Sequence, residues 1–173
     1  MRTLVIGGAA SGKSELAESL VVSGIGPRYY IATMMPHGSE SQRRIKKHRL
    51  MREKKGFTTF ECYTGLASLK LPARGTVLLE CLGNLTANEM FAPEGAGSSA
   101  YESMLAGIKS LEEQCDDLVV VTNDVFADGG AYPQETKNYI NVLGEINQAV
   151  AGRFDRLLEV VCGIPIPLKE VVK

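Results

Sequence analysis

Residues 2–14 of the chain read RTLVIGGAASGKS, a short apolar run that leads directly into a glycine-rich turn. From residue 7 onward this stretch matches the pattern G-x-x-x-x-G-K-S/T at every fixed position. Glycines in such a loop let successive backbone N–H groups curl around a phosphate, and the helix that follows points its positive end at the same anion. An incidental tight turn before a helix is the alternative, but the order of strand, loop and helix favours a phosphate-binding loop.

Two side chains of this loop bring the expected chemistry. The Lys13 ammonium can reach the β- and γ-phosphate oxygens of a nucleoside triphosphate, and the Ser14 hydroxyl can hold Mg²⁺. The pattern predicts the ligand class and leaves the reaction open. The loop residues that we expect to bind the nucleotide are Gly7, Gly8, Ala9, Ala10, Ser11, Gly12, Lys13 and Ser14.

Apolar runs alternate with helical patterns along the rest of the chain. We expect strands at residues 2–6, 29–33, 58–61, 76–79, 118–122 and 157–162. We expect helices at residues 14–22, 40–55, 101–115 and 134–150, and a mobile loop at residues 92–99, which are rich in Gly, Ser and Pro. This alternation predicts an α/β protein with a mostly parallel central sheet, and together with the phosphate-binding loop it predicts a three-layer P-loop NTPase-like fold. Because no linker or repeat is visible, we expect a single domain over residues 1–173.

The composition narrows the class of protein. Of the 173 residues, 45% are hydrophobic and 23% are charged, as in ordinary globular proteins. The 19 basic and 20 acidic residues give a net charge of −1, which argues against a nucleic-acid binder. The longest stretch without a charged residue, 29–39, has 11 residues, whereas a membrane helix needs about 20.

The cysteines and histidines argue against a zinc site. The four cysteines are scattered without a C-x-x-C pair, and the chain has only two histidines. We also expect no signal peptide, because the first apolar run stops at residue 6 before two glycines. Reduced thiols in a cytoplasmic protein are therefore expected.

Polar residues directly follow two of the predicted strands. Glu80 comes after the run VLL at residues 77–79, at the carboxyl end of a parallel strand, where open α/β sheets bind their ligands. Glu80 can hold Mg²⁺ through water or accept a hydrogen bond from a nucleotide hydroxyl, or it can be an acid at the start of a surface loop. The position of Glu80 in the sequence favours neither interpretation over the other. Asn123 and Asp124 follow residues 118–122 in the same way, with an ordinary turn favoured there.

Residues 40–55 concentrate positive charge on a predicted helix. The eight cations of this segment are Arg43, Arg44, Lys46, Lys47, Arg49, Arg52, Lys54 and Lys55. The cluster is either a solvated helix face or a site that attracts polyphosphate. His48 lies within it and shares a helix face with Arg44 and Arg52. Neighbouring cations favour a neutral imidazole, which can attack phosphorus, although a polar surface histidine is the more ordinary interpretation. His37 is interpreted as a loop residue.

Five segments, in this order, resemble those of a known enzyme family. They are residues 7–14 (GGAASGKS), 30–33 (YIAT), 44–49 (RIKKHR), 78–82 (LLECL) and 120–125 (VVTNDV). Weaker similarities follow at Pro133, 144–148 (GEINQ) and 163–169 (GIPIPLK). With this order and spacing, the chain resembles the bifunctional adenosylcobinamide kinase/adenosylcobinamide-phosphate guanylyltransferase family of cobalamin biosynthesis over almost its whole length.

The resemblance implies two reactions at one nucleotide site. In the first, ATP or GTP phosphorylates the hydroxyl of the aminopropanol arm of adenosylcobinamide. In the second, GTP gives GMP to that phosphate with release of pyrophosphate, through a guanylylated histidine. The position that matches this histidine is His48.

The resemblance also implies site residues, cofactors and partners. It makes His48 and Lys13 catalytic and assigns Mg²⁺ to Ser14 and Glu80. It places further nucleotide contacts at Thr33, Met34, Met35, Arg49, Leu50, Met51, Arg52, Glu61 and Glu80. The implied cofactors are GTP, ATP and Mg²⁺, the substrate is adenosylcobinamide, and the protein is expected to be a homo-oligomer without nucleic-acid or membrane partners.

The chain departs from the family pattern at several positions. The family usually has Arg where this chain has Ala10, and it has Gly-Arg-Pro and Trp after the histidine, where this chain reads MREKKGF at residues 51–57. It often has Arg-x-Phe-Arg-Asp before its Gly-x-x-Asn-Gln, where this chain reads NYINVL at residues 138–143. A P-loop small-molecule kinase with a single activity and no covalent intermediate is therefore the alternative. A nucleotide switch protein ranks last, because the chain lacks the Asn-Lys-x-Asp guanine signature.

Overall fold

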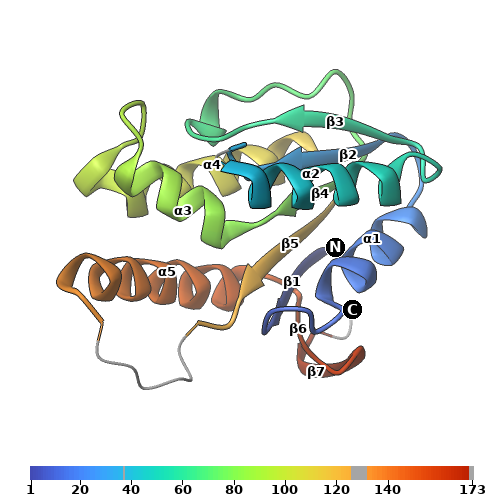
Figure 1. The fold of residues 1–173 in the computed structure, drawn as a ribbon. Coiled ribbons are helices and arrows are strands. Elements are labelled where there is room, and N and C mark those ends of the chain that lie inside the picture. The colour runs from blue at the N-terminus through green and yellow to red at the C-terminus, as the bar shows by residue number, and fades with distance from the viewer. Residues whose placement is uncertain (37, 126–131, 172–173) are drawn as a thin grey trace.

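The computed structural model describes residues 1–36, 38–125 and 132–171. Its centre is a seven-stranded sheet in the order β3-β2-β4-β5-β1-β6-β7 (Figure 1). The strands are β1 (Arg2–Gly7), β2 (Arg28–Ala32), β3 (Phe57–Glu61), β4 (Thr76–Glu80), β5 (Asp117–Asn123), β6 (Arg156–Val161) and β7 (Ile164–Glu170). Neighbours from β3 to β6 pair in parallel, and β7 pairs antiparallel with β6. The mostly parallel sheet predicted from the sequence is confirmed.

Helices cover both faces of this sheet. They are α1 (Lys13–Val22), α2 (Gly38–Arg52), α3 (Leu82–Phe91), α4 (Ala100–Gln114) and α5 (Gln134–Arg153), with 3-10 helices η1 (Leu66–Ser68) and η2 (Gly97–Ser99) in connections. Helices α3, α4 and α5 pack on one another, and their Leu82, Met104 and Ile146 belong to the larger core cluster (Figure 1). Helix α1 covers the opposite face with Ala17 and Val21. The predicted three-layer fold is confirmed.

Alternate residues of the strands belong to different layers. In β5, Leu118 and Val120 lie in the core cluster with α3, α4 and α5, while Val119 and Val121 lie in the cluster with α1. All four are buried, because β5 has strands on both sides and helices on both faces. A continuous apolar run is what such a strand requires.

Helix α3 and strand β7 have no counterpart in the sequence prediction. Helix α3 reads LGNLTANEMF and contains Gly, Asn and Thr, which are weak helix formers, so its propensity is low. It forms because Leu82 and Leu85 become buried against α4 and α5. Strand β7 contains Pro165 and Pro167, which a sheet tolerates at its edge. The expected strands and helices are present, with ends within three residues of the prediction.

The segment 92–99 is tied to α3 by one buried carboxylate. Glu89 is 2% exposed, and its Oε2 accepts a hydrogen bond from the Ala96 N–H at 3.0 Å. Its Oε1 accepts from the Gly65 N–H at 2.7 Å, just before η1. The expected loop therefore contains a short helical turn, η2, and shares an anchor with a second connection.

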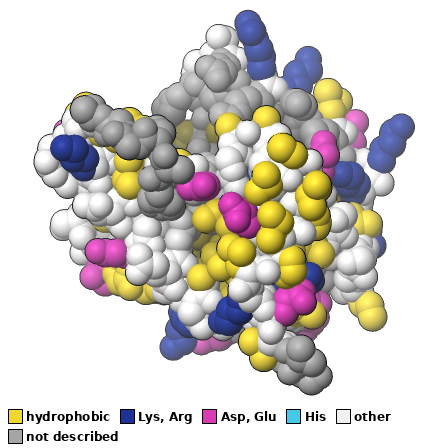
Figure 2. Space-filling model, turned by 90° about the horizontal axis from the view of Figure 1, so that it is seen from below, with side chains coloured by type: hydrophobic (Ala, Val, Ile, Leu, Met, Phe, Trp, Pro, Cys, Tyr) yellow, Lys and Arg dark blue, Asp and Glu magenta, His cyan; other side chains and the backbone are white. Residues whose placement is uncertain are grey.

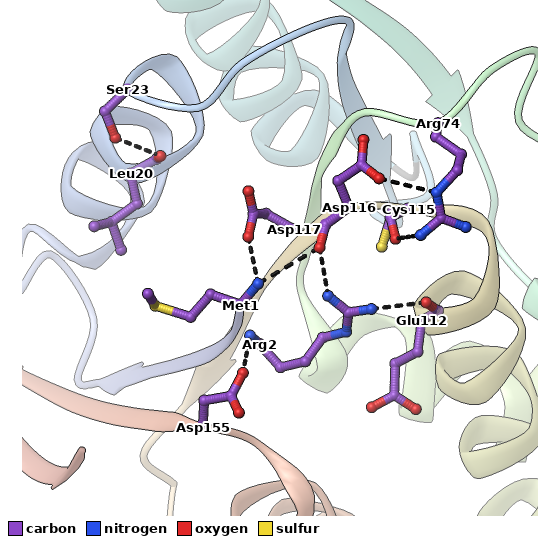
Figure 3. Close-up of polar contacts among 10 residues, drawn as sticks. All are labelled: Met1, Arg2, Leu20, Ser23, Arg74, Glu112, Cys115, Asp116, Asp117 and Asp155. Carbon is purple, nitrogen blue, oxygen red and sulfur yellow. Dashed lines mark hydrogen bonds and ion pairs between the residues drawn. The ribbon is translucent and has the colours of Figure 1, made fainter. Parts of the chain in front are cut away.

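Polar contacts join the amino-terminal ends of the central strands (Figure 3). The Arg2 N–H donates to Asp155 Oδ2 at 2.7 Å, and the Arg2 guanidinium donates to the carbonyls of Asp116 at 2.7 Å and Glu112 at 2.8 Å. The amino-terminal ammonium pairs with Asp117. These contacts connect β1 to the segments before β5 and β6, at the end of the sheet opposite the carboxyl ends of the parallel strands.

Candidate active site

A cavity of about 670 Å³ opens at the carboxyl ends of β1, β2, β4 and β5. The loop between β1 and α1 and the start of α1 line it with residues 9–15. The strand ends and the start of α3 contribute residues 30, 32–34, 80–81, 84, 121 and 123–125. Positions 45, 49 and 52 of α2 and residues 59, 61 and 63 in and after β3 complete the wall. This is the edge at which α/β sheets bind their ligands.

The phosphate loop has the backbone conformation that its sequence predicts. Gly12 caps α1 with a φ of 93°, a left-handed conformation that glycine adopts without strain. A Cβ at Gly7 would lie 2.8 Å from the Val160 carbonyl oxygen, so β6 packs against the start of the loop only with glycine there. Lys13 Nζ donates to the Gly8 carbonyl at 2.9 Å, across the loop. The loop thus forms a compact cradle at the amino terminus of a helix, as anion sites do.

The turn between β6 and β7 forms the outer wall of this loop. Cys162 and Gly163 both have positive φ, 51° and 79°, as a two-residue type I′ hairpin requires. The Gly163 N–H donates to the Ser11 carbonyl at 2.8 Å. A Cβ at Gly12 would lie only 3.1 Å from Gly163 Cα. The hairpin therefore fixes the orientation of the peptide group that joins Ser11 and Gly12.

Glu80 links the phosphate loop to β2. The Ser14 hydroxyl donates to Glu80 Oε1, and the Tyr30 hydroxyl donates to Glu80 Oε2 at 2.9 Å. Thr33 holds the backbone directly after Glu80, because the Thr33 Oγ1 accepts a hydrogen bond from the Cys81 N–H at 2.7 Å. Burial and the nearby carboxylate raise the pKa of Tyr30 well above its usual value, so the phenol stays a donor. Serine and glutamate oxygens are the hard ligands that Mg²⁺ prefers.

Arg52 brings a buried cation from the end of α2 into the cavity. It is 5% exposed, and its guanidinium carbon lies 3.4 Å from the centre of the Tyr30 ring. Within the described part of the chain, neither Nε nor Nη1 of Arg52 has a hydrogen-bond partner. A buried guanidinium with unused donors fits an anionic ligand, since it otherwise leaves a charge desolvated and unpaired.

A second polar group lies on the β3 side of the cavity. Arg49 of α2 forms an ion pair with Glu61, whose Oε2 also accepts from the Tyr63 hydroxyl at 2.9 Å. Burial and the hydrogen bond to Glu61 raise the pKa of Tyr63. Both ion-pair partners are largely exposed, so the pair contributes little to stability. Its place in the cavity wall makes it a contact for a polar ligand.

The end of β5 forms the opposite wall. Asn123 and Asp124 line the cavity, and the Asp124 N–H donates to the Gly7 carbonyl at 3.1 Å. The Asn123 amide approaches the buried Cys81 Sγ at 3.9 Å. Burial raises the pKa of the Cys81 thiol, which argues against a thiolate here.

The structure brings most of the expected site residues into one cavity. These lining residues are Ala9, Ala10, Ser11, Gly12, Lys13, Ser14, Thr33, Met34, Arg49, Arg52, Glu61 and Glu80. Gly7 and Gly8 shape the loop without lining the cavity, and Met35 and the exposed Leu50 do not line it.

Two expected residues lie on α2 with side chains outside the described set, namely His48 and Met51. His37 also lies outside the described residues.

Several lining residues are not among the site residues that the sequence predicts. They are Glu15, Tyr30, Ala32, Ile45, Thr59, Tyr63, Cys81, Asn84, Val121 and Val125. For Tyr30 the available signal was its place two residues before the end of a strand next to the Glu80 strand. Asn84 carried no comparable signal, because the helix that presents it was itself not predicted.

Two further features of the described residues concern membranes and metals. None of the helices in residues 1–36, 38–125 and 132–171 is long and apolar enough to cross a membrane. No three His, Cys, Asp or Glu side chains among those residues gather into a metal-binding group.

Residues 3–168 match the family model described as cobinamide kinase / cobinamide phosphate guanyltransferase. The chain is 30% identical over 171 residues to the bifunctional adenosylcobalamin biosynthesis protein CobP of Pseudomonas aeruginosa, covering 98% of each chain. It is 31% identical over 186 residues to the bifunctional adenosylcobalamin biosynthesis protein CobU of Salmonella typhimurium, covering 98% of this chain and all of that one. The Escherichia coli CobU protein is 31% identical over 185 residues, with the same coverage.

Among solved structures, the fold is similar to a prototypical ATPase from the type III secretion system of pathogenic bacteria. The TM-score is 0.53 with 10% sequence identity, and the match covers 91% of this chain. The chain spans half the length of that ATPase chain. At this identity the likeness shows the P-loop NTPase fold alone.

Proposed function

Because the chain belongs to the cobinamide kinase/cobinamide phosphate guanyltransferase family, we propose that it catalyses two successive reactions of adenosylcobalamin biosynthesis at one nucleotide site. The first transfers a phosphoryl group from ATP or GTP to the hydroxyl of the aminopropanol arm of adenosylcobinamide. The second transfers GMP from GTP to the new phosphate and releases pyrophosphate. The observation that carries this proposal is the similarity over 98% of the chain to relatives named as bifunctional.

The phosphate loop binds the nucleotide in both reactions. Its backbone N–H groups surround the phosphates, and the Lys13 ammonium neutralises charge on the β- and γ-phosphate oxygens. Arg52 supplies a further cation from inside the cavity wall. Such donors stabilise the charge that develops on the transferred group, because they act in a partly water-excluded cavity.

Ser14 and Glu80 are the residues that hold Mg²⁺ in this proposal. Their side-chain oxygens already meet at the carboxyl edge of β4, beside the phosphate loop. One hydroxyl and one carboxylate fit Mg²⁺, which usually keeps several waters and binds substrate phosphates. When bound, the ion would neutralise phosphate charge, while the loop and Lys13 orient the nucleotide.

His48 is the residue that carries GMP between the two half-reactions. The described neighbours of this position support the assignment: Ile45, Arg49 and Arg52 line the cavity, and residue 48 is three positions after Ile45 and four before Arg52. Residues three and four apart are neighbours on a helix surface. The spacing of residue 48 from these lining residues is what supports its assignment.

The covalent step balances without a further reactant. A neutral imidazole nitrogen attacks the α-phosphorus of GTP, an N–P bond forms, and the bond to the β-phosphate oxygen breaks, so pyrophosphate leaves. An oxygen of adenosylcobinamide phosphate then attacks the same phosphorus, the N–P bond breaks, and the imidazole is regenerated. The energy-rich N–P bond lets GMP move on to a weakly nucleophilic phosphate.

Turnover and labelling of the wild-type protein test the proposal together. With adenosylcobinamide, Mg²⁺ and ATP or GTP we expect the phosphorylated corrinoid, and with GTP also the GMP adduct and pyrophosphate. With GTP labelled in the α-phosphate and no corrinoid, the protein should retain label that acid removes and base does not. Kinase turnover without any such label would favour the single-activity kinase and contradict the covalent scheme.

We propose that the protein assembles as a homo-oligomer. Its other partners are small molecules rather than nucleic acid, and its location is the cytoplasm. An apolar face supports self-association: Val161, Ile164, Ile166, Leu168 and Val171 are 41–64% exposed on and beside edge strand β7. Figure 2, seen from below, shows hydrophobic side chains gathered on this side of the molecule. Such patches commonly mark protein contacts. Light scattering should give a mass of at least two chains of 18.7 kDa each, and the mass of a single chain would contradict the assembly.

A further inference from the structure

Tyr30 contacts the magnesium-site carboxylate without belonging to the phosphate loop. Its hydroxyl donates to Glu80 Oε2 at 2.9 Å, while the Ser14 hydroxyl donates to Glu80 Oε1. We propose that Tyr30 is a positioning residue that fixes the Glu80 carboxylate for Mg²⁺–nucleotide binding in both reactions. This inference rests on the proposed function, because it assigns to Glu80 the role of holding the ion.

The strand register brings the two side chains together. In the parallel pair β2 and β4, Tyr30 is opposite Leu78 and Ala32 is opposite Glu80. The Tyr30 backbone is therefore two register positions short of Glu80 along the strand direction. The long tyrosine side chain spans this distance, so its hydroxyl reaches the Glu80 carboxylate. A shorter donor at this position would not reach the strand end.

The tyrosine ring is itself fixed from two sides. Its edge meets Phe57 with ring centres 6.1 Å apart and an angle of 81° between the planes. The Arg52 guanidinium covers its face at 3.4 Å. Because the ring is 3% exposed and held by both neighbours, the hydroxyl has little freedom to leave Glu80.

The kind of hydrogen bond also matters. A hydrogen bond to a carboxylate oxygen is charge-assisted and stronger than one between neutral groups. A donor to Glu80 Oε2 limits rotation of the carboxylate and keeps Oε1, which accepts from Ser14, facing the phosphate loop.

The arrangement also connects two parts of the site. Arg52 lies at the end of the helix that carries His48, and Tyr30 is the side chain between Arg52 and Glu80. The position of the carboxylate therefore depends on a residue that packs against α2. This is a reason for a tyrosine here rather than an apolar residue of equal size.

The decisive variant is Tyr30→Phe, which keeps the ring and removes only the hydroxyl. We expect the Mg²⁺ concentration for half-maximal rate to rise about 10- to 100-fold in both reactions, the usual effect of removing the hydrogen-bond partner of a metal ligand. A readout independent of turnover is Mn²⁺ binding to the complex with GDP, followed by electron paramagnetic resonance. Its affinity should fall by a similar factor.

Tyr29→Phe is the matched control. Tyr29 is adjacent on the same strand and equally buried, at 2%, but it belongs to the other core layer and packs on Phe60. It should leave both metal readouts unchanged. If the melting temperature falls by the same amount in both variants and neither variant changes the Mn²⁺ affinity, Tyr30 has only a structural role and the inference is wrong.

The result separates this inference from the proposed function. Mn²⁺ binding to the GDP complex needs no corrinoid, so it tests Tyr30 even if no corrinoid is turned over. Conversely, the wild-type protein can perform both reactions while the Tyr30→Phe variant shows a normal Mg²⁺ dependence. That result overturns this inference and leaves the proposed function intact.

Discussion

Replacement of His48 by alanine is expected to abolish the covalent GMP label while phosphorylation of adenosylcobinamide continues. The His48 imidazole is the protein group that is proposed to accept GMP, so its loss removes the covalent intermediate. GMP transfer should then slow at least about 1,000-fold, the scale on which removal of a nucleophile acts. The kinase reaction has a hydroxyl as acceptor and does not pass through the histidine. Labelling with α-phosphate-labelled GTP and separate assays of the two products measure both effects.

The second histidine of the chain provides the control. The sequence contains only two histidines, so His37→Ala tests whether loss of any imidazole has the same result. The control should keep the label and both activities. Label retained by the His48→Ala protein, or lost only from the control, would remove His48 from the covalent role.

Lys13→Ala should stop both reactions together. Lys13 lies in the phosphate loop and lines the cavity, and its ammonium is the loop's side-chain cation for the β- and γ-phosphates. Loss of one such electrostatic donor typically costs at least about 100-fold in rate. We also expect weaker GTP binding in calorimetry, because the ammonium contacts the ground-state phosphates as well.

The fold should survive the loss of this lysine. Lys13 is only partly buried and lies outside both core clusters, so the melting temperature should change by no more than about 2 °C. Lys109→Ala, an exposed lysine on α4, is the matched control and should keep full activity. Unchanged GTP affinity in the Lys13→Ala protein would contradict the role given to this residue.

The elements that the sequence predicts well are those whose local pattern agrees with their environment. The run 118–122 is apolar at almost every position, and β5 is buried on both faces. Helix α3 and strand β7 behave differently, since tertiary packing overrides weak propensity in α3 and an edge position tolerates the prolines of β7. No local pattern reports such packing.

The candidate site divides in the same way. The phosphate loop is predictable because all of its chemistry lies within eight consecutive residues. The contact of Tyr30 with Glu80 joins residues 50 positions apart, and the cover of Arg52 over Tyr30 depends on where α2 ends. Such contacts are set by strand order and helix placement, which the periodicity of a single chain does not specify. The family resemblance assigned roles to Arg52 and Glu80, whereas Tyr30 belonged to a resembling segment without being given a role.

The turn between β6 and β7 makes the phosphate loop depend on a distant part of the sequence. The motif occupies residues 7–14, yet β1 lies between β5 and β6, and the Gly163 N–H supports its loop through the Ser11 carbonyl. A fragment that lacks residues 156–171 would carry the whole motif without this support, so we expect it to bind GTP more weakly than residues 1–173.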